Sequence, residues 1–322
     1  MDLRNLPIGV FDSGVGGLTV VREIFRNLPN EKIIYYGDTA RVPYGNKSRE
    51  TIIRYSRQIT QFLLSKNVKA IVIACNTATS LAIDAVKEMT DLPVIGVIEP
   101  GARAAVSATV SGRIGIIGTS ATVTSGLYEK CIRDLLPDAR VFSKACPLFV
   151  HLVEEGMIDD SVTVEMIHRY LDDMIESDRI DTLILGCTHY PLLRSVIARE
   201  IGGTYADYPV SGDADVDEDG SRDVDADGSR DPDADGDGSR DPNGGGKAAA
   251  GTGAGKIQLV NPAYTTAMEL ARLLAERGMA TDIPAAPSDH QFYSSDSPDS
   301  FRSFASRILG LQIDKVSLKI LD

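Results

Sequence analysis

Short apolar segments alternate with longer amphipathic ones along most of the 322-residue chain. Strands covered on both faces of a parallel sheet are apolar throughout, whereas helices on such a sheet repeat apolar residues every three or four positions. The first third of the chain therefore predicts strands at 8–11, 32–36, 70–74 and 93–98, and helices at 17–28 and 49–67. The next part predicts strands at 113–119, 139–143 and 181–187, and helices near 121–136, 147–156, 161–177 and 190–201.

This alternation of strands and helices predicts an α/β fold in which parallel sheets lie between helices. We expect two tandem parallel-sheet α/β domains, pseudo-symmetric and flavodoxin-like, with the active site in the cleft between them. The first domain is expected to comprise residues 1–98 and 257–322, and the second residues 99–210. The segment 97–101, with the sequence VIEPG, is the expected crossover between them.

The segment 211–256 differs from the rest of the chain in composition. It holds twelve Asp and one Glu against three Arg and two Lys, and so carries about eight of the chain's 13 net negative charges. A segment with almost no apolar residues cannot offset its conformational entropy by burial, so we expect an acidic, glycine-rich, disordered insertion. A strand at 256–262 and a helix at 263–278 follow it, which places the insertion in a surface loop. The alternative is a calcium site, because DVDEDG and DVDADG match the start of an EF-hand loop, but position 12 is Ala226 or Ala234 instead of Glu.

Composition and charge narrow the class of protein. Hydrophobic residues make up 43% and charged residues 25% of the chain, as in ordinary globular proteins. No apolar run approaches the roughly 20 residues that span a bilayer, and the N-terminal segment lacks the apolar core of a signal peptide. We therefore expect a cytoplasmic protein without membrane contact, and the absence of a basic stripe argues against a nucleic-acid partner. The four cysteines form no CxxC pair and are expected to be reduced thiols.

Two predicted strands end in the same unusual way, one in each half of the chain. AIVIACNTATS ends its apolar run at Cys75 and DTLILGCTHYPLL ends its run at Cys187, and polar residues and a helix follow each cysteine. The start of a helix favours a thiolate. Two facing thiols suit a reaction in which one removes a proton from a carbon and the other returns a proton to the opposite face. The pattern therefore indicates racemisation, with Asp12 and His189 as candidates to tune the protonation of the thiols.

Other interpretations of these residues stay open at this point. Each cysteine could be an inert buried thiol, the two could form a regulatory disulfide, or Cys75, Cys187 and His189 could bind zinc, although their spacing lacks the usual ligand pairs. The turn that follows the strand at 8–11, DSGVGG, has neither the Lys of a P-loop nor the third small residue of a dinucleotide fingerprint. It favours an anion at a helix N-terminus, or it is a tight turn that Asp12 caps.

Longer motifs around these residues resemble those of the glutamate racemases, within the aspartate/glutamate racemase superfamily. They include GVFDSGVGGLTV, YYGDTARVPYG, IACNTAT, IGIIGTSATVTSGLY, CPLFVHLVEEG and LGCTHYPLL, and together they extend over nearly the whole chain outside 211–256. The resemblance implies cofactor-independent interconversion of L- and D-glutamate, without a metal, to supply D-glutamate for bacterial peptidoglycan. The catalytic residues that it implies are Cys75, Cys187, Asp12, His189 and Glu154. The substrate contacts that it implies are Asp12, Ser13, Pro43, Tyr44, Gly45, Asn76, Thr77, Thr119, Thr122 and Thr188.

The resemblance also assigns directions and partners. Cys75 would act on the α-proton of D-glutamate and Cys187 on that of L-glutamate, while the carboxylate of Asp12 could pair with the substrate ammonium. The expected partners are glutamate, as a small-molecule substrate, and a second copy of the chain in a homodimer. The alternatives are an aspartate racemase or another amino-acid racemase of the same superfamily, and, in a different class, a non-catalytic binding protein on this fold.

Overall fold

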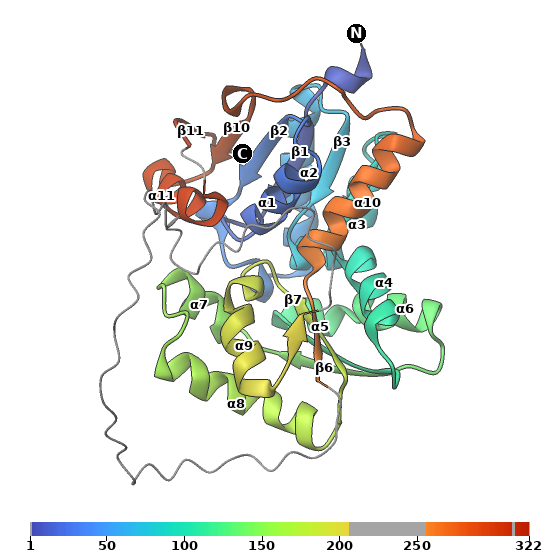
Figure 1. Cartoon of the computed structure of the whole chain (residues 1–322). Helices are drawn as coiled ribbons and strands as arrows, with labels where there is room; N and C mark the ends of the chain where they lie inside the picture. Colours follow the sequence, from blue (N-terminus) through green and yellow to red (C-terminus); the bar gives the residue numbers. More distant parts are fainter. Residues whose placement is uncertain (1, 206–255, 311–312, 322) are drawn as a thin grey trace, which may run out of the picture. The chain divides into compact units, whose positions relative to one another are not determined.

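Two all-parallel β-sheets with helices packed on them make up the part of the chain that the structure describes (Figure 1). This computed structural model describes residues 2–205, 256–310 and 313–321. The architecture expected from the sequence, two parallel-sheet α/β domains, is confirmed. Among the described residues, no helix combines the length and the apolar character that crossing a membrane requires.

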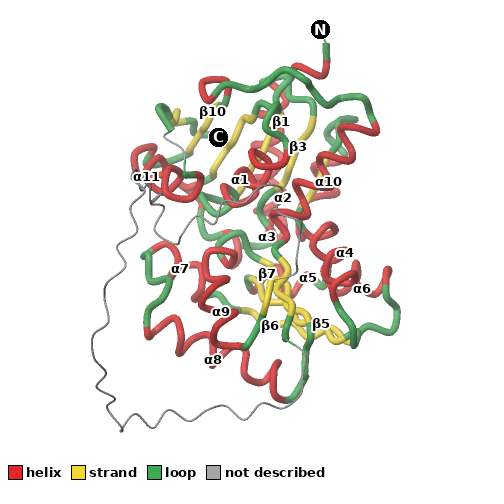
Figure 2. Tube along the Cα trace, in the orientation of Figure 1, coloured by secondary structure: helices red, strands yellow, loops and turns green. Residues whose placement is uncertain are grey.

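The first sheet has six parallel strands in the order β11-β10-β2-β1-β3-β4. The strand bounds are Ile8–Asp12 (β1), Ile33–Gly37 (β2), Ala70–Ile73 (β3), Val94–Gly96 (β4), Gln291–Ser294 (β10) and Val316–Leu318 (β11). Neighbouring residues of a strand face opposite sides of the sheet: Val10 and Val72 pack in one group of core residues, Phe11 and Ile71 in another. Both faces are therefore buried under helices (Figure 2), which explains why these strands are apolar at nearly every position. The helices of this half are α1 (Leu18–Asn27), α2 (Arg49–Ser65), α3 (Asn76–Lys87), α10 (Pro262–Glu276) and α11 (Pro298–Leu309).

The second sheet has five parallel strands in the order β6-β5-β7-β9-β8. The strand bounds are Arg113–Gly118 (β5), Arg140–Ala145 (β6), Thr182–Gly186 (β7), Thr204–Tyr205 (β8) and Gln258–Val260 (β9). The helices of this half are α4 (Ile98–Ala108), α5 (Ser120–Ser125), α6 (Leu127–Leu135), α7 (Leu148–Glu154), α8 (Ser161–Glu176) and α9 (Arg194–Ile201). Short 3₁₀ turns lie at Leu3–Asn5, Thr39–Arg41, Tyr44–Asn46, Tyr190–Leu193 and Pro287–Asp289.

The two sheets share one strand order over four consecutive strands. β1 lies between β2 and β3 and the order continues to β4, just as β5 lies between β6 and β7 and the order continues to β9. In doubly wound sheets of this kind, ligands bind beyond the carboxyl ends of the strands. β3 and β7 therefore hold equivalent places in the two halves, and so do the loops that follow β1 and β5.

The chain crosses between the sheets twice, each time through a helix. α4 leads from β4 to β5, and α10 leads from β9 back to β10. These two helices pack against each other, and α10 also packs along α1 (Figure 1). At the contact between α4 and α10, a Cβ added to Gly101 would lie 3.1 Å from the ring of Pro262. The absence of a side chain at this position therefore allows the two crossing helices to approach closely.

The expected crossover at 97–101 lies where the chain leaves β4, and most of it is the first turn of α4. Two other expectations from the sequence need correction. The strand at 258–260 belongs to the second sheet, because it pairs with β7 on one side and β8 on the other, although the expected boundary at 257 assigns it to the first domain. The helix expected at 121–136 is interrupted at Gly126, whose φ of 65° is left-handed and separates α5 from α6. The expected insertion at 211–256 and its calcium alternative lie outside the described residues, apart from Lys256.

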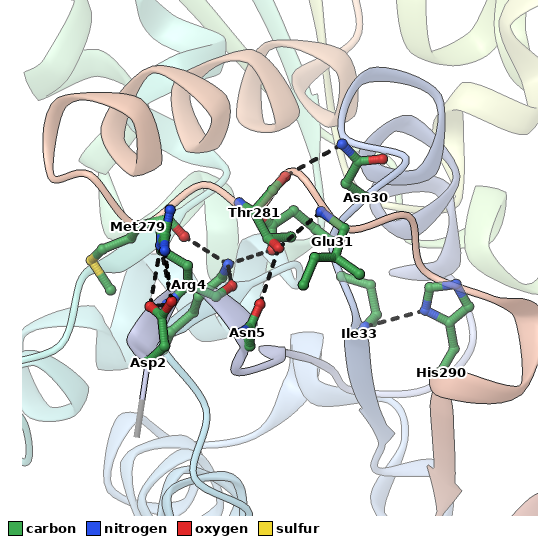
Figure 3. A network of polar contacts seen from close by, with 11 residues as sticks. Asp2, Arg4, Asn5, Asn30, Glu31, Ile33, Met279, Thr281 and His290 are labelled. Carbon is green, nitrogen blue, oxygen red and sulfur yellow. Dashed lines mark hydrogen bonds and ion pairs between the residues drawn. The ribbon is translucent and has the colours of Figure 1, made fainter.

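A buried ion pair lies at the edge of the first sheet where the strands begin. The ammonium of Lys69, just before β3, is 2.5 Å from a carboxylate oxygen of Glu31, and both side chains are almost fully buried. The ammonium also donates to the carbonyls of Arg4 and Met279, at 2.7 and 2.8 Å, and these bonds help to offset the cost of burying its charge. The backbone N–H of Thr281 donates to the other oxygen of Glu31 at 3.1 Å. The network in Figure 3 thus joins the N-terminal segment to the segment that follows α10.

Candidate active site

A cavity of about 180 Å³ lies at the carboxyl ends of strands from both sheets. The loops after β1, β2, β3, β5 and β7 contribute to its wall, together with α7. Its size suits a small metabolite, and neither Lys nor Arg occurs among the described residues that line it. The lining residues are Ser13, Val42, Pro43, Tyr44, Gly45, Cys75, Asn76, Thr77, Thr119, Val150, His151, Glu154, Cys187, Thr188 and His189.

Cys75 lies between β3 and α3 and caps the helix. Its sulfur accepts the backbone N–H of Ala78 at 3.4 Å, and its thiol donates to Oγ of Ser13 at 3.6 Å. Burial raises the pKa of the Cys75 thiol to about 12, and the nearby carboxylate of Asp12 contributes to the rise. Cys75 is therefore a neutral thiol at neutral pH, because burial outweighs the effect of the helix start.

Cys187 follows β7 and has an imidazole as its partner. Its sulfur lies 3.8 Å from Nδ1 of His189, and Nε2 of the same ring lies 3.1 Å from Oε1 of Glu154. Burial by itself would lower the pKa of His189, but its hydrogen bonds to Cys187 and Glu154 raise that pKa to about 10. The same hydrogen bond from His189 holds the pKa of Glu154 below its usual range. His189 is consequently protonated at neutral pH and places a positive charge beside the sulfur of Cys187.

Asp12 lies behind the cavity wall, at the end of β1. Its side chain is fully buried, and Oδ2 accepts two backbone N–H groups of the following turn, at 3.1 and 2.9 Å. Its Oδ1 has no hydrogen-bond partner among the described residues. The same turn brings Gly16 against the second half of the molecule, where an added Cβ would lie 2.4 Å from Oγ1 of Thr188 and 2.7 Å from the ring of His189. Glycine at position 16 therefore allows the turn of the first half to approach the thiol loop of the second.

Three threonine hydroxyls form a cluster that joins the two halves. Thr77 in the first turn of α3 is 2.9 Å from Thr119, which follows β5, and Thr119 is 3.0 Å from Thr122 in α5. Thr77 and Thr119 line the cavity, and Thr122 is buried. Gly45 lies so close to Thr119 that an added Cβ would lie 2.8 Å from its side chain. Because hydroxyls both donate and accept hydrogen bonds, this wall can bind carboxylate and ammonium groups.

The structure brings most of the expected site residues together. Those in the cavity wall are Ser13, Pro43, Tyr44, Gly45, Cys75, Asn76, Thr77, Thr119, Glu154, Cys187, Thr188 and His189. Asp12 and Thr122 are the two that do not line it. Val42, Val150 and His151 also line the cavity and are not among the residues expected from the sequence. His151 lies three residues before Glu154 in α7, and this spacing on one helix face is the signal that could have identified it.

The arrangement bears on the alternatives for the two thiols. All four cysteines are free, so Cys75 and Cys187 are not joined by a disulfide. Within residues 2–205, 256–310 and 313–321, no three His, Cys, Asp or Glu side chains gather as metal ligands do. Both thiols border a cavity and are not sealed inside a core. The two halves thus each contribute one thiol, in different protonation environments, to one small cavity.

Comparison with known proteins finds similar sequences and structures. The model of the Asp/Glu/hydantoin racemase family matches residues 8–210. The glutamate racemase of Persephonella marina is 58% identical over 194 residues, which cover 60% of this chain and 74% of that protein. The crystal structure of a glutamate racemase isoform from Bacillus anthracis has a TM-score of 0.78 and 35% identity, and the match covers 99% of this chain and 98% of that chain. The glutamate racemase of Francisella tularensis, solved in complex with D-glutamate, has a TM-score of 0.77 and 32% identity, with 99% of both chains covered.

Proposed function

This chain belongs to the Asp/Glu/hydantoin racemase family, and we propose that it interconverts L-glutamate and D-glutamate without a cofactor. The observation that carries the proposal is the pair of thiols, Cys75 and Cys187, which follow equivalent strands of the two sheets and line one cavity. The relatives named above, which are glutamate racemases, support glutamate as the substrate.

In the proposed reaction the α-carbon of the substrate lies between the two sulfurs. With L-glutamate, the thiolate of Cys187 removes the α-proton, and the thiol of Cys75 delivers its own proton to the opposite face of the carbon. Cys187 then carries the proton and Cys75 the negative charge, which is the state that D-glutamate needs for the reverse reaction. The raised pKa of Cys75 and the protonated His189 beside Cys187 both support this starting distribution.

We propose that the polar wall binds the substrate through neutral groups. The residues Ser13, Asn76, Thr77, Thr119 and Thr188 offer hydroxyl, amide and backbone donors to the two carboxylates. Asp12 supplies buried negative charge behind this wall, on the side of Cys75. We assign Glu154 to His189 as the partner that keeps this imidazole oriented and charged.

The wider biological setting extends the same proposal. The resemblance to glutamate racemases supports a role in supplying D-glutamate for peptidoglycan, and a cytoplasmic location and a homodimer stay predictions from the sequence. The division into domains at 98, 210 and 257 also stays a proposal, in which the segment 258–260 joins the second sheet. The insertion at 211–256 has no part in the proposed reaction.

Exchange of the α-proton with solvent tests the proposed function directly. We expect that the full chain, incubated with L-glutamate in D₂O, yields both enantiomers with deuterium at the α-carbon, as measured by NMR and chiral chromatography. Aspartate serves as the competing substrate and should exchange far more slowly. Addition of hydroxylamine, which traps pyridoxal phosphate, should not reduce the rate. If glutamate gained no deuterium, or if hydroxylamine abolished the exchange, the proposal would fail.

A further inference from the structure

Tyr44 forms part of the cavity wall, but its hydroxyl is engaged elsewhere. The phenol donates to Oδ2 of Asp38 at 2.5 Å. Tyr44 is 2% exposed and Asp38 is completely buried, so water does not compete for this bond. A hydrogen bond to a buried carboxylate is stronger than one between neutral groups, and it fixes the orientation of the ring. The face that Tyr44 presents to the cavity is therefore set by Asp38.

The second oxygen of Asp38 connects this pair to the C-terminal part of the chain. Oδ1 accepts the hydroxyl of Ser295, the residue after β10, at 2.9 Å. Ser295 is itself held in place, since its backbone N–H donates to the carbonyl of Gly37 at 3.1 Å and its Oγ accepts the N–H of Ala40 at 2.9 Å. The carboxylate thus accepts a hydroxyl at each oxygen. One hydroxyl belongs to Tyr44 in the cavity wall, and the other belongs to Ser295, which follows β10 of the first sheet.

Arg41 supplies the positive charge that this buried carboxylate needs. Its guanidinium lies 3.6 Å from Oδ2 of Asp38, and it also donates to the side chain of Gln58 and to the backbone carbonyl of Leu321. The guanidinium stacks over the ring of Tyr55, 4.3 Å from its centroid. Burial raises the pKa of Asp38, while the hydroxyl of Tyr44 and the charge of Arg41 oppose that rise.

We infer that Asp38 is a positioning residue for substrate binding. It fixes Tyr44 in the cavity wall relative to Ser295, the residue after β10. The inference rests on the proposed function, because it takes Tyr44 as a substrate contact. Asp38 does not line the cavity and touches no reacting atom. Its effect passes through the bond to Tyr44, so a change at Asp38 alters the binding of glutamate more than the proton transfer at the thiols.

The test compares Asp38→Asn with Tyr44→Phe and with the double variant, in the full-length chain. Asn keeps the shape and one acceptor oxygen but loses the charge, whereas Phe keeps the ring and loses only the hydroxyl. Both single variants should raise the KM for glutamate about tenfold while kcat stays within about threefold of the wild type. The double variant should resemble the more affected single variant, because both changes remove the same charge-assisted hydrogen bond.

Asp181→Asn is the matched control. Asp181 also accepts a hydroxyl, that of Thr109, and two backbone N–H groups, but it precedes β7 at the edge of the second sheet away from the cavity. This variant should lose thermal stability without a change in KM. A wild-type KM in folded Asp38→Asn, or additive effects in the double variant, would overturn the inference.

Further measurements distinguish a failure of this inference from misfolding of a variant and from a failure of the proposed function. If Asp38→Asn does not fold, Tyr44→Phe and Ser295→Ala can be measured instead, since each removes one hydroxyl donor and leaves the carboxylate of Asp38 in place. Unchanged KM values in both variants would overturn the inference. Deuterium exchange by the wild-type chain reports on the proposed function alone. Calorimetric titration with racemic glutamate, in which no net conversion occurs, reports on binding alone, and equal affinities of the wild-type and variant chains would refute the inference.

Discussion

Cys75 and Cys187 hold equivalent places in the two halves, but their neighbours carry different charges. Cys75 contacts a hydroxyl and a backbone N–H, with the buried carboxylate of Asp12 nearby. Cys187 contacts the protonated imidazole of His189, which Glu154 supports from the other side. The repeated strand order thus supplies two thiols, whereas the side chains around them give each thiol a different electrostatic environment. The proposed racemisation needs such a difference, because two thiols or two thiolates could not take and give a proton in one turnover.

The largest expected effect comes from removing either thiol. Cys75→Ser and Cys187→Ser should each lower the rate of racemisation about 10³-fold, because a hydroxyl is a much weaker acid than a thiol. Circular dichroism of the glutamate enantiomers measures the rate. Cys131→Ser is the control, since Cys131 is a free thiol outside the cavity, and it should keep wild-type activity. Full activity in Cys75→Ser or Cys187→Ser would show that this thiol does not transfer the proton, and the comparison of the two thiols would then have no bearing on the reaction.

Removing the charge next to one thiol should have a smaller effect. His189→Asn should lower kcat/KM about 10²-fold, because the positive charge beside Cys187 is lost. The two enantiomers of glutamate have equal free energies in water, so kcat/KM must fall by the same factor in both directions. His168→Asn is the matched control, since His168 pairs with Asp172 and Glu200 outside the cavity. A His189→Asn variant as active as this control would show that the charge is not needed.

The same substitution gives a pH dependence of stability. The pKa of His189 rises from 6.5 to about 10 on folding, so the folded chain binds this proton more tightly than the unfolded chain. The stabilisation is complete below about pH 6.5 and is lost as the pH rises towards about 10. The difference in Tm between wild type and His189→Asn should therefore shrink across this window. A difference that does not change with pH would mean that the folded chain holds His189 neutral.

The smallest effect is expected from removing the hydroxyl that contacts Cys75. Ser13→Ala removes a hydroxyl 3.6 Å from the sulfur, a long contact between neutral groups, and should lower kcat/KM about threefold. Ser143→Ala, which removes a hydroxyl bonded to Glu129 outside the cavity, is the control. A loss as large as that of His189→Asn would mean that both thiols depend equally on their neighbours.

The sequence predicted the strands that end in thiols because burial on both faces leaves an unmistakable apolar run that stops at a polar residue. It also predicted that the loops after these strands converge, since parallel strands end at one edge of a sheet. It could not assign the three residues of β9 to a sheet, because a short apolar strand carries no information about its neighbour. It missed His151 for a related reason: a helix face becomes part of a cavity only through the packing of other elements against it.

The different electrostatic surroundings of the two thiols could not be predicted from the sequence either. Cys75 and Cys187 stand in similar local patterns, and a cysteine before a helix favours a thiolate in both. Burial raises the pKa of Cys75, whereas the sulfur of Cys187 faces the imidazole of His189, which is bonded to Glu154, 35 residues earlier in the chain. Long-range contacts of this kind depend on the assembled fold.

The double crossing through α4 and α10 has a mechanical consequence. A single linker would leave the two halves free to twist, whereas two helices packed side by side, with Gly101 against Pro262, form a double-stranded hinge. Because both connections between the sheets run through this helix pair, a change that separates α4 from α10 would disturb both sheets at once. The contact of Thr77 with Thr119 also joins the two halves, beside the cavity.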